Sequence, residues 1–199
     1  MGGLSTHTHL ISNHRLPLES CKRVAIVGVT GSGKTTLAHQ ISRILGIPHI
    51  ELDALHWGPN WTPAPTEVFV ERVAKALSGN AWVADGNYRA VRDLVWGRAD
   101  MIVWLDYSLP LIMRRLIMRT LRRVVLREEL WNENRERLSA QFLSRDSLLL
   151  WAIQSYPARR KEYPRLLSRP EYSHLLVVRL CSPRATSGWL SSFVMYNAR

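Results

Sequence analysis

Short apolar runs alternate along the chain with longer segments in which apolar residues recur at helical spacing. The first run, residues 22–28, is rich in β-branched residues and ends at a glycine, as expected for a buried parallel strand. Similar runs predict four more strands, at residues 47–51, 81–85, 100–105 and 174–180. Helical spacing predicts helices at residues 34–45 and 66–77. This alternation indicates an α/β fold whose parallel sheet is covered on both faces.

A long, mostly helical pattern separates the fourth predicted strand from the fifth. It covers residues 109–169, is rich in arginine and is too long for a simple crossover, so we expect a helical lid inserted into one domain of residues 21–199. Residues 1–20 lack the continuous apolar core of a secretory signal and are expected to form a mobile leader. No apolar run approaches the roughly 20 residues that cross a bilayer, so no membrane association is expected.

The charge balance indicates an anionic partner. The chain of 199 residues carries 27 lysines and arginines against 16 acidic residues, a net charge of +11, and arginine supplies most of the excess. Guanidinium groups bind phosphate in a bidentate way, which suits a nucleotide or a nucleic acid. The alternative is that the composition reflects genomic base content and solubility alone.

The chain has two cysteines, Cys21 and Cys181. They are too few for a disulfide framework and lack CxxC spacing, which favours a reducing compartment, by default the cytoplasm. Cys21 precedes the first predicted strand and Cys181 follows the last, so parallel strands would place them near opposite ends of the sheet. No bridge between them is expected.

The strongest chemical signal is the segment GVTGSGKT at residues 28–35, which satisfies the P-loop pattern GxxxxGK[ST]. Its glycines let the backbone wrap a phosphate chain, and the following helix adds its positive N-terminus. Lys34 is expected to reach the terminal phosphates and act in catalysis, while the Thr35 hydroxyl is expected to bind Mg²⁺. We therefore assign ATP binding to Gly28, Gly31, Ser32, Gly33, Lys34, Thr35 and Thr36.

Other enzyme classes lack their required motifs in this sequence. The guanine-reading NKxD and the DxxG switch of regulatory GTPases are absent, no GxSxG occurs, and the histidines show no paired metal-ligand spacing. A motor or helicase ATPase usually needs a larger core than this chain provides. The length fits a small kinase.

Six segments carry a family resemblance: residues 27–36, 51–57, 82–88 (WVADGNY), 100–106, 119–123 (RTLRR) and 127–136. Together they resemble the adenylate-kinase-related small P-loop kinases, and more closely the subgroup often labelled DNA topology modulation proteins. The resemblance spans roughly residues 21–185. It implies a five-stranded parallel sheet in the order 2-3-1-4-5, flanked by helices, of the nucleoside-monophosphate-kinase type. It also implies an acceptor region after the second strand, a lid that closes over ATP, and a charged amphipathic C-terminal helix, which residues 184–199 do not show.

A carboxylate ends the third predicted strand, where parallel sheets present residues to a ligand crevice. Asp85 begins the segment DGNY and resembles the Asp-Gly pair of nucleoside monophosphate kinases, whose aspartate holds Mg²⁺ through water. We expect Asp85 to act with Thr35 in metal binding and to take part in catalysis. The alternative is a plain turn with Gly86.

The acceptor site of this chain departs from that pattern. Asn87, Tyr88 and Arg89 stand where nucleoside monophosphate kinases have Phe-Pro-Arg. Asn87 and Tyr88 are therefore expected to contact the acceptor. Arg92, on the helix that follows, is a candidate clamp for an anionic group of the acceptor, and a solvated helix arginine is the equal alternative.

The segment after the second predicted strand offers further acceptor contacts. In related small kinases a carboxylate at the position of Asp53 orients or deprotonates the acceptor hydroxyl, so we expect a catalytic and acceptor-binding role, with a helix N-cap as the alternative. Trp57 lies in a loop stiffened by prolines and is expected to stack on a planar acceptor. The alternative is that Trp57 covers an edge of the core.

The predicted helix at residues 109–127 has two faces. One face is a mainly apolar stripe of Met113, Leu116, Ile117, Thr120, Leu121 and Val124. Arginines gather on the complementary side: Arg115, Arg119, Arg122 and Arg123. In adenylate-kinase-like proteins an Arg-xxx-Arg pair opens the lid, so the resemblance assigns ATP binding to Arg119 and a catalytic role to Arg123, with Arg135 and Arg145 contributing from the returning helices. A solvated basic face is the alternative.

These features favour an ATP-dependent phosphotransferase that moves the γ-phosphoryl group of Mg-ATP to a small acceptor, a nucleoside monophosphate or another small metabolite. The rival hypothesis is a nucleic-acid-associated protein that uses ATP as a switch, suggested by the net charge and the subgroup's label. No sequence-reading DNA motif supports it. The sequence leaves the oligomeric state open.

Overall fold

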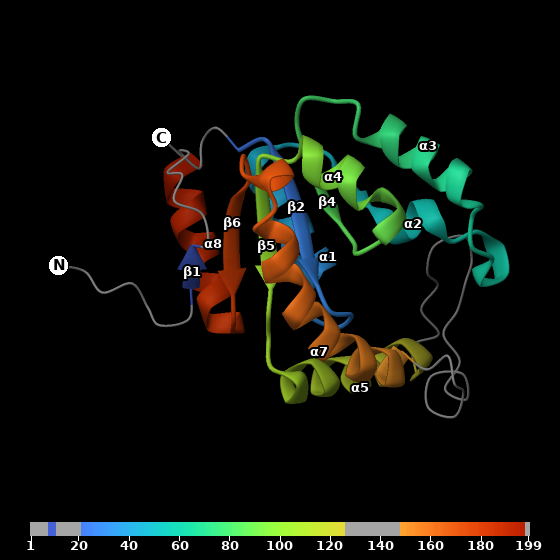
Figure 1. The fold of residues 1–199 in the computed structure, drawn as a ribbon. Helices are drawn as coiled ribbons and strands as arrows, with labels where there is room; N and C mark the ends of the chain where they lie inside the picture. The colour runs from blue at the N-terminus through green and yellow to red at the C-terminus, as the bar shows by residue number, and fades with distance from the viewer. Residues whose placement is uncertain (1–7, 11–20, 126–147, 198–199) are drawn as a thin grey trace.

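One sheet with the strand order β1-β6-β5-β2-β4-β3 organises the chain (Figure 1). The computed structural model describes residues 8–10, 21–125 and 148–197. Five of the strands run parallel to one another: β2 (Arg23–Gly28), β3 (His49–Glu51), β4 (Trp82–Asp85), β5 (Met101–Leu105) and β6 (Leu176–Leu180). Counted from β2, their order is 2-3-1-4-5, which confirms the predicted sheet.

The sixth strand is an addition that the sequence pattern does not predict. Thr8–Leu10 form β1, which pairs antiparallel with β6 at the edge of the sheet. Its pairing satisfies backbone groups that β6 would otherwise present at an open edge.

Helices cover both faces of the sheet. α1 (Lys34–Leu45) contacts β2, β3 and β4 and lies beside α8 (Pro183–Asn197), which also contacts β6. The opposite face carries α3 (Thr66–Ala76) and α4 (Arg92–Arg98) (Figure 1). The remaining short elements are α2 (Leu52–His56) and the 3₁₀ turns η2 (Pro59–Trp61), η3 (Arg89–Val91) and η5 (Pro170–Tyr172).

The alternation of side chains along β2 divides the interior into two cores. Val24 and Ile26 pack with Ile41 of α1 on one face, and Ala25 and Val27 belong to the core on the other. All four strand residues are buried, as expected for a central parallel strand covered by helices on both sides. The continuous apolar run at residues 22–28 is therefore explained by burial on both faces.

Two long helices, α5 (Leu109–Val125) and α7 (Leu148–Leu167), flank the residues that the model leaves undescribed. They pack against each other, and in Figure 1 α5 lies below the arrowheads of β5 and β6. The buried Asp106, just after β5, holds α7 in place because its carboxylate forms an ion pair with Arg160 of α7 at 2.9 Å. It forms a second ion pair with Arg179 of β6. The proposed lid function of residues 109–169 stays a prediction.

The C-terminal segment corrects one expectation. Residues 184–199 lack the charged amphipathic pattern, yet α8 forms there. Most residues of α8 are apolar or small, and Trp189 and Leu190 pack against the core that α1 covers. Contacts with neighbouring elements therefore stabilise α8 without the charged outer face that the resemblance implied.

The two cysteines are free, as expected. Cys21 precedes β2 and Cys181 follows β6, at opposite ends of parallel strands, and β5 lies between those strands in the sheet. Within the described ranges, no helix combines the length and the apolar character needed to cross a membrane.

The burial of α1 gives a stability prediction. Ile41 is 0% exposed in the core between α1 and the sheet, whereas Ile153 of α7 is 45% exposed. Ile41→Ala should lower the free energy of unfolding by about 2–5 kcal/mol because it removes buried methylene groups and leaves a cavity. Ile153→Ala should change it by no more than about 0.5 kcal/mol. Urea unfolding measures both, and equal losses would contradict the described packing.

Candidate active site

The P-loop connects β2 to α1 at the carboxyl edge of the sheet. Gly28, Gly31 and Gly33 all have positive φ angles, of 153°, 78° and 93°. A Cβ atom at Gly31 would lie 2.6 Å from Cγ of Leu116, so α5 packs directly against the loop. The backbone therefore needs glycine here both for its conformation and for the close approach of α5.

Two features of this loop suit an anionic ligand. The first residue before α1, Gly33, provides no side-chain cap, so the first amide groups of the helix have no side-chain partner there. The Ser32 hydroxyl is buried and finds no hydrogen-bond partner among the residues that the structure describes. Thr36, the last residue of the predicted nucleotide-binding set, is exposed on α1.

Lys34 begins α1, and charged groups from four other elements surround its ammonium group. Desolvation lowers the pKa of Lys34, and the carboxylates of Asp85 and Asp53 partly oppose that effect by attraction. Arg159 and Arg119 act in the same direction as desolvation because they repel the ammonium charge. Part of the Lys34 residue remains exposed, but its charged end is enclosed by protein. A bound phosphate would neutralise this concentration of positive charge.

The two residues predicted to bind magnesium meet in the structure. The Thr35 hydroxyl donates a hydrogen bond to Oδ2 of Asp85 at 2.8 Å, linking the start of α1 to the end of β4. Asp85 is 5% exposed, and its other oxygen, Oδ1, lies 2.7 Å from Nε2 of His49 in β3. A hydroxyl and a carboxylate beside a phosphate-binding loop are hard oxygen ligands of the kind that Mg²⁺ takes, so these residues fit the ion.

His49 is a site residue that sequence reasoning missed. Its position before Glu51 carries no motif, and only the pairing of β3 with β4 brings it beside Asp85. The register aligns Glu51 with Asp85, so the carboxyl ends of β3 and β4 lie side by side at the same edge of the sheet. A sequence search for strand-end polar residues on neighbouring strands is the one signal that could have found it.

The side chain of Asn87, which was predicted to contact the acceptor, is hydrogen-bonded to the P-loop in the structure. Its side-chain amide donates to the Gly28 carbonyl, and its Oδ1 accepts from the Gly28 backbone amide at 3.2 Å. The same Oδ1 accepts from the Tyr163 hydroxyl at 2.9 Å, and Arg159 donates to that hydroxyl at 2.9 Å. A continuous chain of hydrogen bonds therefore joins α7 to the P-loop through Asn87.

Asp53 and Tyr88 form a second pair beyond the P-loop. Asp53 lies on α2 and its Oδ1 accepts a hydrogen bond from the Tyr88 hydroxyl at 2.6 Å. Burial raises the pKa of Tyr88 strongly, and the negative charge and hydrogen bond of Asp53 raise it further. Tyr88 thus stays a neutral donor that fixes the orientation of the Asp53 carboxylate.

Trp57 and Arg92 have protein partners in the structure. Trp57 makes edge contacts with His56 and Trp61, as expected for a residue that packs over the core edge. The Arg92 guanidinium lies 3.1 Å from Oε1 of Glu162 and above the Trp96 ring. Arg92 is therefore not a simple solvated arginine, because α7 already engages it.

A narrow pocket lies between these groups on the α4 side of the sheet. Small residues of the strands and the following turn form its floor, and aromatic and polar side chains form its walls. Its lining includes Ala25, Ala84, Gly86, Asn87, Tyr88, Arg92, Trp96 and Tyr163. Ala84 and Gly86, the residues on either side of Asp85 in the sequence, both line the pocket, so it lies at the end of β4.

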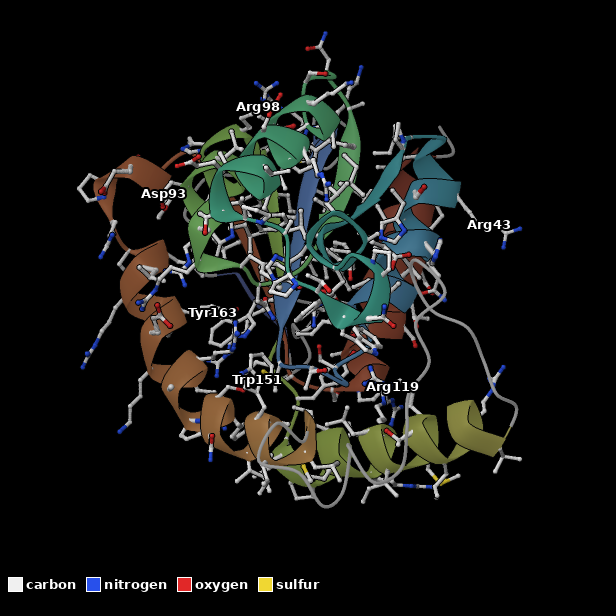
Figure 2. All side chains as sticks on the ribbon, turned by 90° about the vertical axis from the view of Figure 1, so that its right-hand side faces the viewer. Arg43, Asp93, Arg98, Arg119, Trp151 and Tyr163 are labelled. Atoms are coloured by element: carbon white, nitrogen blue, oxygen red, sulfur yellow. The ribbon has the colours of Figure 1, made fainter. Side chains whose placement is uncertain are left out.

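The arginines of α5 face the site differently from the predicted two-sided pattern. Arg115 donates to the Ser32 carbonyl at 2.9 Å, and in Figure 2 Arg119 points from α5 toward the body of the molecule. Two residues of the predicted apolar stripe, Ile117 and Leu121, are instead exposed. The predicted stripe is confirmed at Leu116 and Thr120, which are buried. It is wrong at Ile117 and Leu121, because the face of α5 that packs on the P-loop presents Leu116 and Arg115.

The remaining predicted lid residues cannot be placed at the site. Arg123 belongs to α5, but its side chain lies outside the described part of the chain, as do Arg135 and Arg145 entirely. Arg159, by contrast, was not predicted and lies near Lys34 from α7, with its guanidinium 5.1 Å from the Trp151 ring centre. Figure 2 shows Trp151 and Tyr163 on the same helix, on the side that faces the sheet.

No protein-family model matches the chain, and no curated protein matches it significantly. Solved structures do match. A gluconokinase from Sinorhizobium meliloti 1021 aligns with 19% identity and a TM-score of 0.51, covering 91% of this chain and 94% of its own. A shikimate kinase from Bacteroides thetaiotaomicron aligns with 16% identity and a TM-score of 0.53, covering 89% of this chain and 98% of its own.

A shikimate kinase from Acinetobacter baumannii in complex with shikimate aligns with 15% identity and a TM-score of 0.54, covering 89% of this chain and 93% of its own. All three are small P-loop kinases, and the similarity covers nearly the whole of each chain. The chain therefore has the fold of the small P-loop kinases. At such identities the similarity concerns the fold and transfers no substrate.

The tight contact between Gly31 and Leu116 gives a testable contrast between two glycines. Gly31→Ala should destabilise the protein by about 1–3 kcal/mol because its φ of 78° disfavours a side chain and its Cβ would meet Leu116. Gly188→Ala is the control, since that glycine lies within α8 with nothing within 4 Å of an added Cβ, and it should stabilise by about 0.5–1 kcal/mol. Urea unfolding gives both signs, and a Gly31→Ala protein as stable as the parent would refute the loop geometry.

Proposed function

We propose that the protein is an ATP-dependent phosphotransferase that acts on a small hydroxylated metabolite. The observation that carries the proposal is the assembly of Lys34, Thr35 and Asp85 at the carboxyl edge of the sheet. The loop geometry there suits a nucleoside triphosphate. The structural similarity to a gluconokinase and to shikimate kinases supports a small acceptor of this kind. Nucleoside monophosphates, the acceptors implied by the resemblance to adenylate-kinase-related enzymes, are one acceptor class within this proposal.

The pocket between α4 and α7 supports an acceptor site in this region. Asp53 and Tyr88 stand at the α2 side of this region, and Arg92 offers a cation on the other side. Ala25 and Ala84 form a small floor, but the free space of the pocket is only about that of one water molecule, so an acceptor would have to displace side chains of its walls to enter. A hydroxylated acceptor that also carries a carboxylate or phosphate would exchange the Arg92 to Glu162 ion pair for its own contact with Arg92.

In the transfer, an acceptor hydroxyl oxygen attacks the γ-phosphorus and the bond to the β–γ bridging oxygen breaks, releasing ADP. The Asp53 carboxylate accepts the hydroxyl proton, and Tyr88 holds that carboxylate in position by its hydrogen bond. Lys34 stabilises charge on the transferred group. Thr35 and Asp85 would hold Mg²⁺, which would neutralise negative charge on the phosphates.

α5 and α7 enclose the phosphates in this proposal. Arg119 and Arg159 approach Lys34 from these two helices, so three cations converge on the space that the terminal phosphates would fill. Such convergence supports a lid role for part of residues 109–169. The hydrogen bonds from Arg159 through Tyr163 to Asn87 couple the position of α7 to the P-loop.

The activity itself is tested by ATP consumption against a panel of polyhydroxylated acids, sugars and nucleoside monophosphates. Lys34→Ala should lower turnover by about 10²-fold or more while the fold persists, because the ammonium charge acts on the transferring group. Lys75→Ala is the matched control, since Lys75 is exposed in the last turn of α3. A Lys34→Ala protein with unchanged turnover of the best acceptor would contradict the proposal.

The role of α5 is tested separately from that of Lys34. Arg119→Ala should raise the KM for ATP by about 10-fold with a smaller effect on kcat, because its charge binds the phosphates in the ground state as well as in the transition state. Arg114→Ala is the control, since Arg114 lies on the same helix and is exposed. Identical effects of the two substitutions on the KM for ATP would remove Arg119 from the nucleotide site.

Duplex DNA provides the test of the rival class. A protein that uses ATP as a switch on nucleic acid should bind duplex DNA with an affinity that falls steeply with salt, and it should show no acceptor-dependent ATP consumption. Acceptor turnover without DNA would support the phosphotransferase.

A further inference from the structure

A cluster of nitrogen and oxygen ligands lies beside the proposed active site and takes no part in the proposed transfer. It consists of His39 of α1 and His49 and Glu51 of β3, whose ligand atoms all lie within 4.8 Å of one another. Oε1 of Glu51 is the centre of the cluster, 3.7 Å from Nε2 of His39 and 4.0 Å from Nδ1 of His49. The three groups come from two elements that the sheet and α1 hold in fixed relation.

The geometry needs only a small closure to hold a metal ion. Ligand atoms at 2.0–2.1 Å from a tetrahedral ion lie roughly 3.4 Å apart. The side chain of His39 is 61% exposed and that of Glu51 23%, so both can rotate toward the ion while His49, with 7% exposure, stays fixed. One buried ligand and two adjustable ones would leave a fourth position open to water.

The orientation of His49 supports a metal site. Its Nε2 lies 2.7 Å from Oδ1 of the buried Asp85, while its Nδ1 faces Glu51. Histidines that bind metal usually donate their second ring N–H to a carboxylate, which fixes the tautomer and leaves the other nitrogen free to coordinate. Asp85 is placed to do this for His49, so the nitrogen toward the cluster is the one available to a metal.

The donor set selects the metal class. Two imidazoles and one carboxylate suit borderline transition metals such as Zn²⁺, whereas Mg²⁺ takes oxygen ligands and keeps much of its water. The cluster therefore differs in chemistry from the pair of Thr35 and Asp85, although Asp85 joins the two through one hydrogen bond on each of its oxygens.

We propose that His39, His49 and Glu51 form a zinc-class metal site, with Asp85 as the carboxylate that orients His49. The site goes beyond phosphotransfer, since zinc binding requires neither nucleotide nor acceptor. Its place next to Asp85 means that occupancy holds His49 as a hydrogen-bond donor to the carboxylate that also accepts from Thr35.

The test is a titration of the full chain with Zn²⁺ alone against a chromophoric zinc chelator, without nucleotide. The wild-type protein should bind one more zinc ion than His39→Ala, or bind it at least about 10-fold more tightly, and Glu51→Ala should show a similar loss. His174→Ala is the matched control, because His174 is exposed and precedes β6, which β5, β2 and β4 separate from β3 in the sheet, and it should bind as the wild type does. Histidines of residues 1–20 are present in every protein compared, so the differences isolate the cluster.

A second readout guards against indirect effects. Zn²⁺ should raise the melting temperature of the wild type and of His174→Ala but not that of His39→Ala, and a large excess of Mg²⁺ should leave the zinc affinity unchanged. His39→Ala binding zinc with wild-type stoichiometry and affinity would overturn the proposal. So would displacement of the zinc by Mg²⁺, which would place the ion at the oxygen ligands of Thr35 and Asp85.

Discussion

The buried carboxylate of Asp85 is the interaction on which the arrangement of the site depends. A carboxylate that is 5% exposed must have its oxygens paired, and here one oxygen accepts from Thr35 of α1 while the other contacts His49 of β3. The end of β4 is therefore tied to the first turn of α1 and to the neighbouring strand. Because α1 begins at the P-loop, this one side chain sets where the phosphate-binding backbone lies relative to the sheet.

The second constraint is the attachment of α5 and α7 to that backbone. Leu116 and Arg115 of α5 contact Gly31 and Ser32, and Tyr163 of α7 reaches Gly28 through Asn87. The repulsion among the cations that collect around Lys34 is the cost of this packing, and it is relieved when an anion occupies the site. The same contacts that close the site thus favour a phosphate ligand, which is how the fold and the proposed activity are connected.

Local patterns were enough to predict the parallel strands, α1 from Lys34 to Leu45 and the P-loop, because strand burial and glycine spacing depend on short segments. The order of the strands came from the family resemblance, and the structure confirms it. Local patterns failed where packing between distant segments decides the outcome. His49 meets Asp85 through strand register, and Arg159 acts on the charge of Lys34 from α7, a helix that the ion pair between Arg160 and Asp106 attaches to the end of β5. The helix α8 and the exposed Ile117 show the same limit, since neighbours, not periodicity, determine which of their faces is covered.

A crystal structure with Mg²⁺ and a non-hydrolysable ATP analogue would test the proposed nucleotide site most directly. We expect a triphosphate wrapped by the backbone of residues 28–33, with its terminal phosphates at Lys34 and the metal ion between Thr35 and Asp85. Density for the phosphates elsewhere on the protein, with Thr35 and Asp85 still bonded to each other and no metal ion beside them, would contradict it.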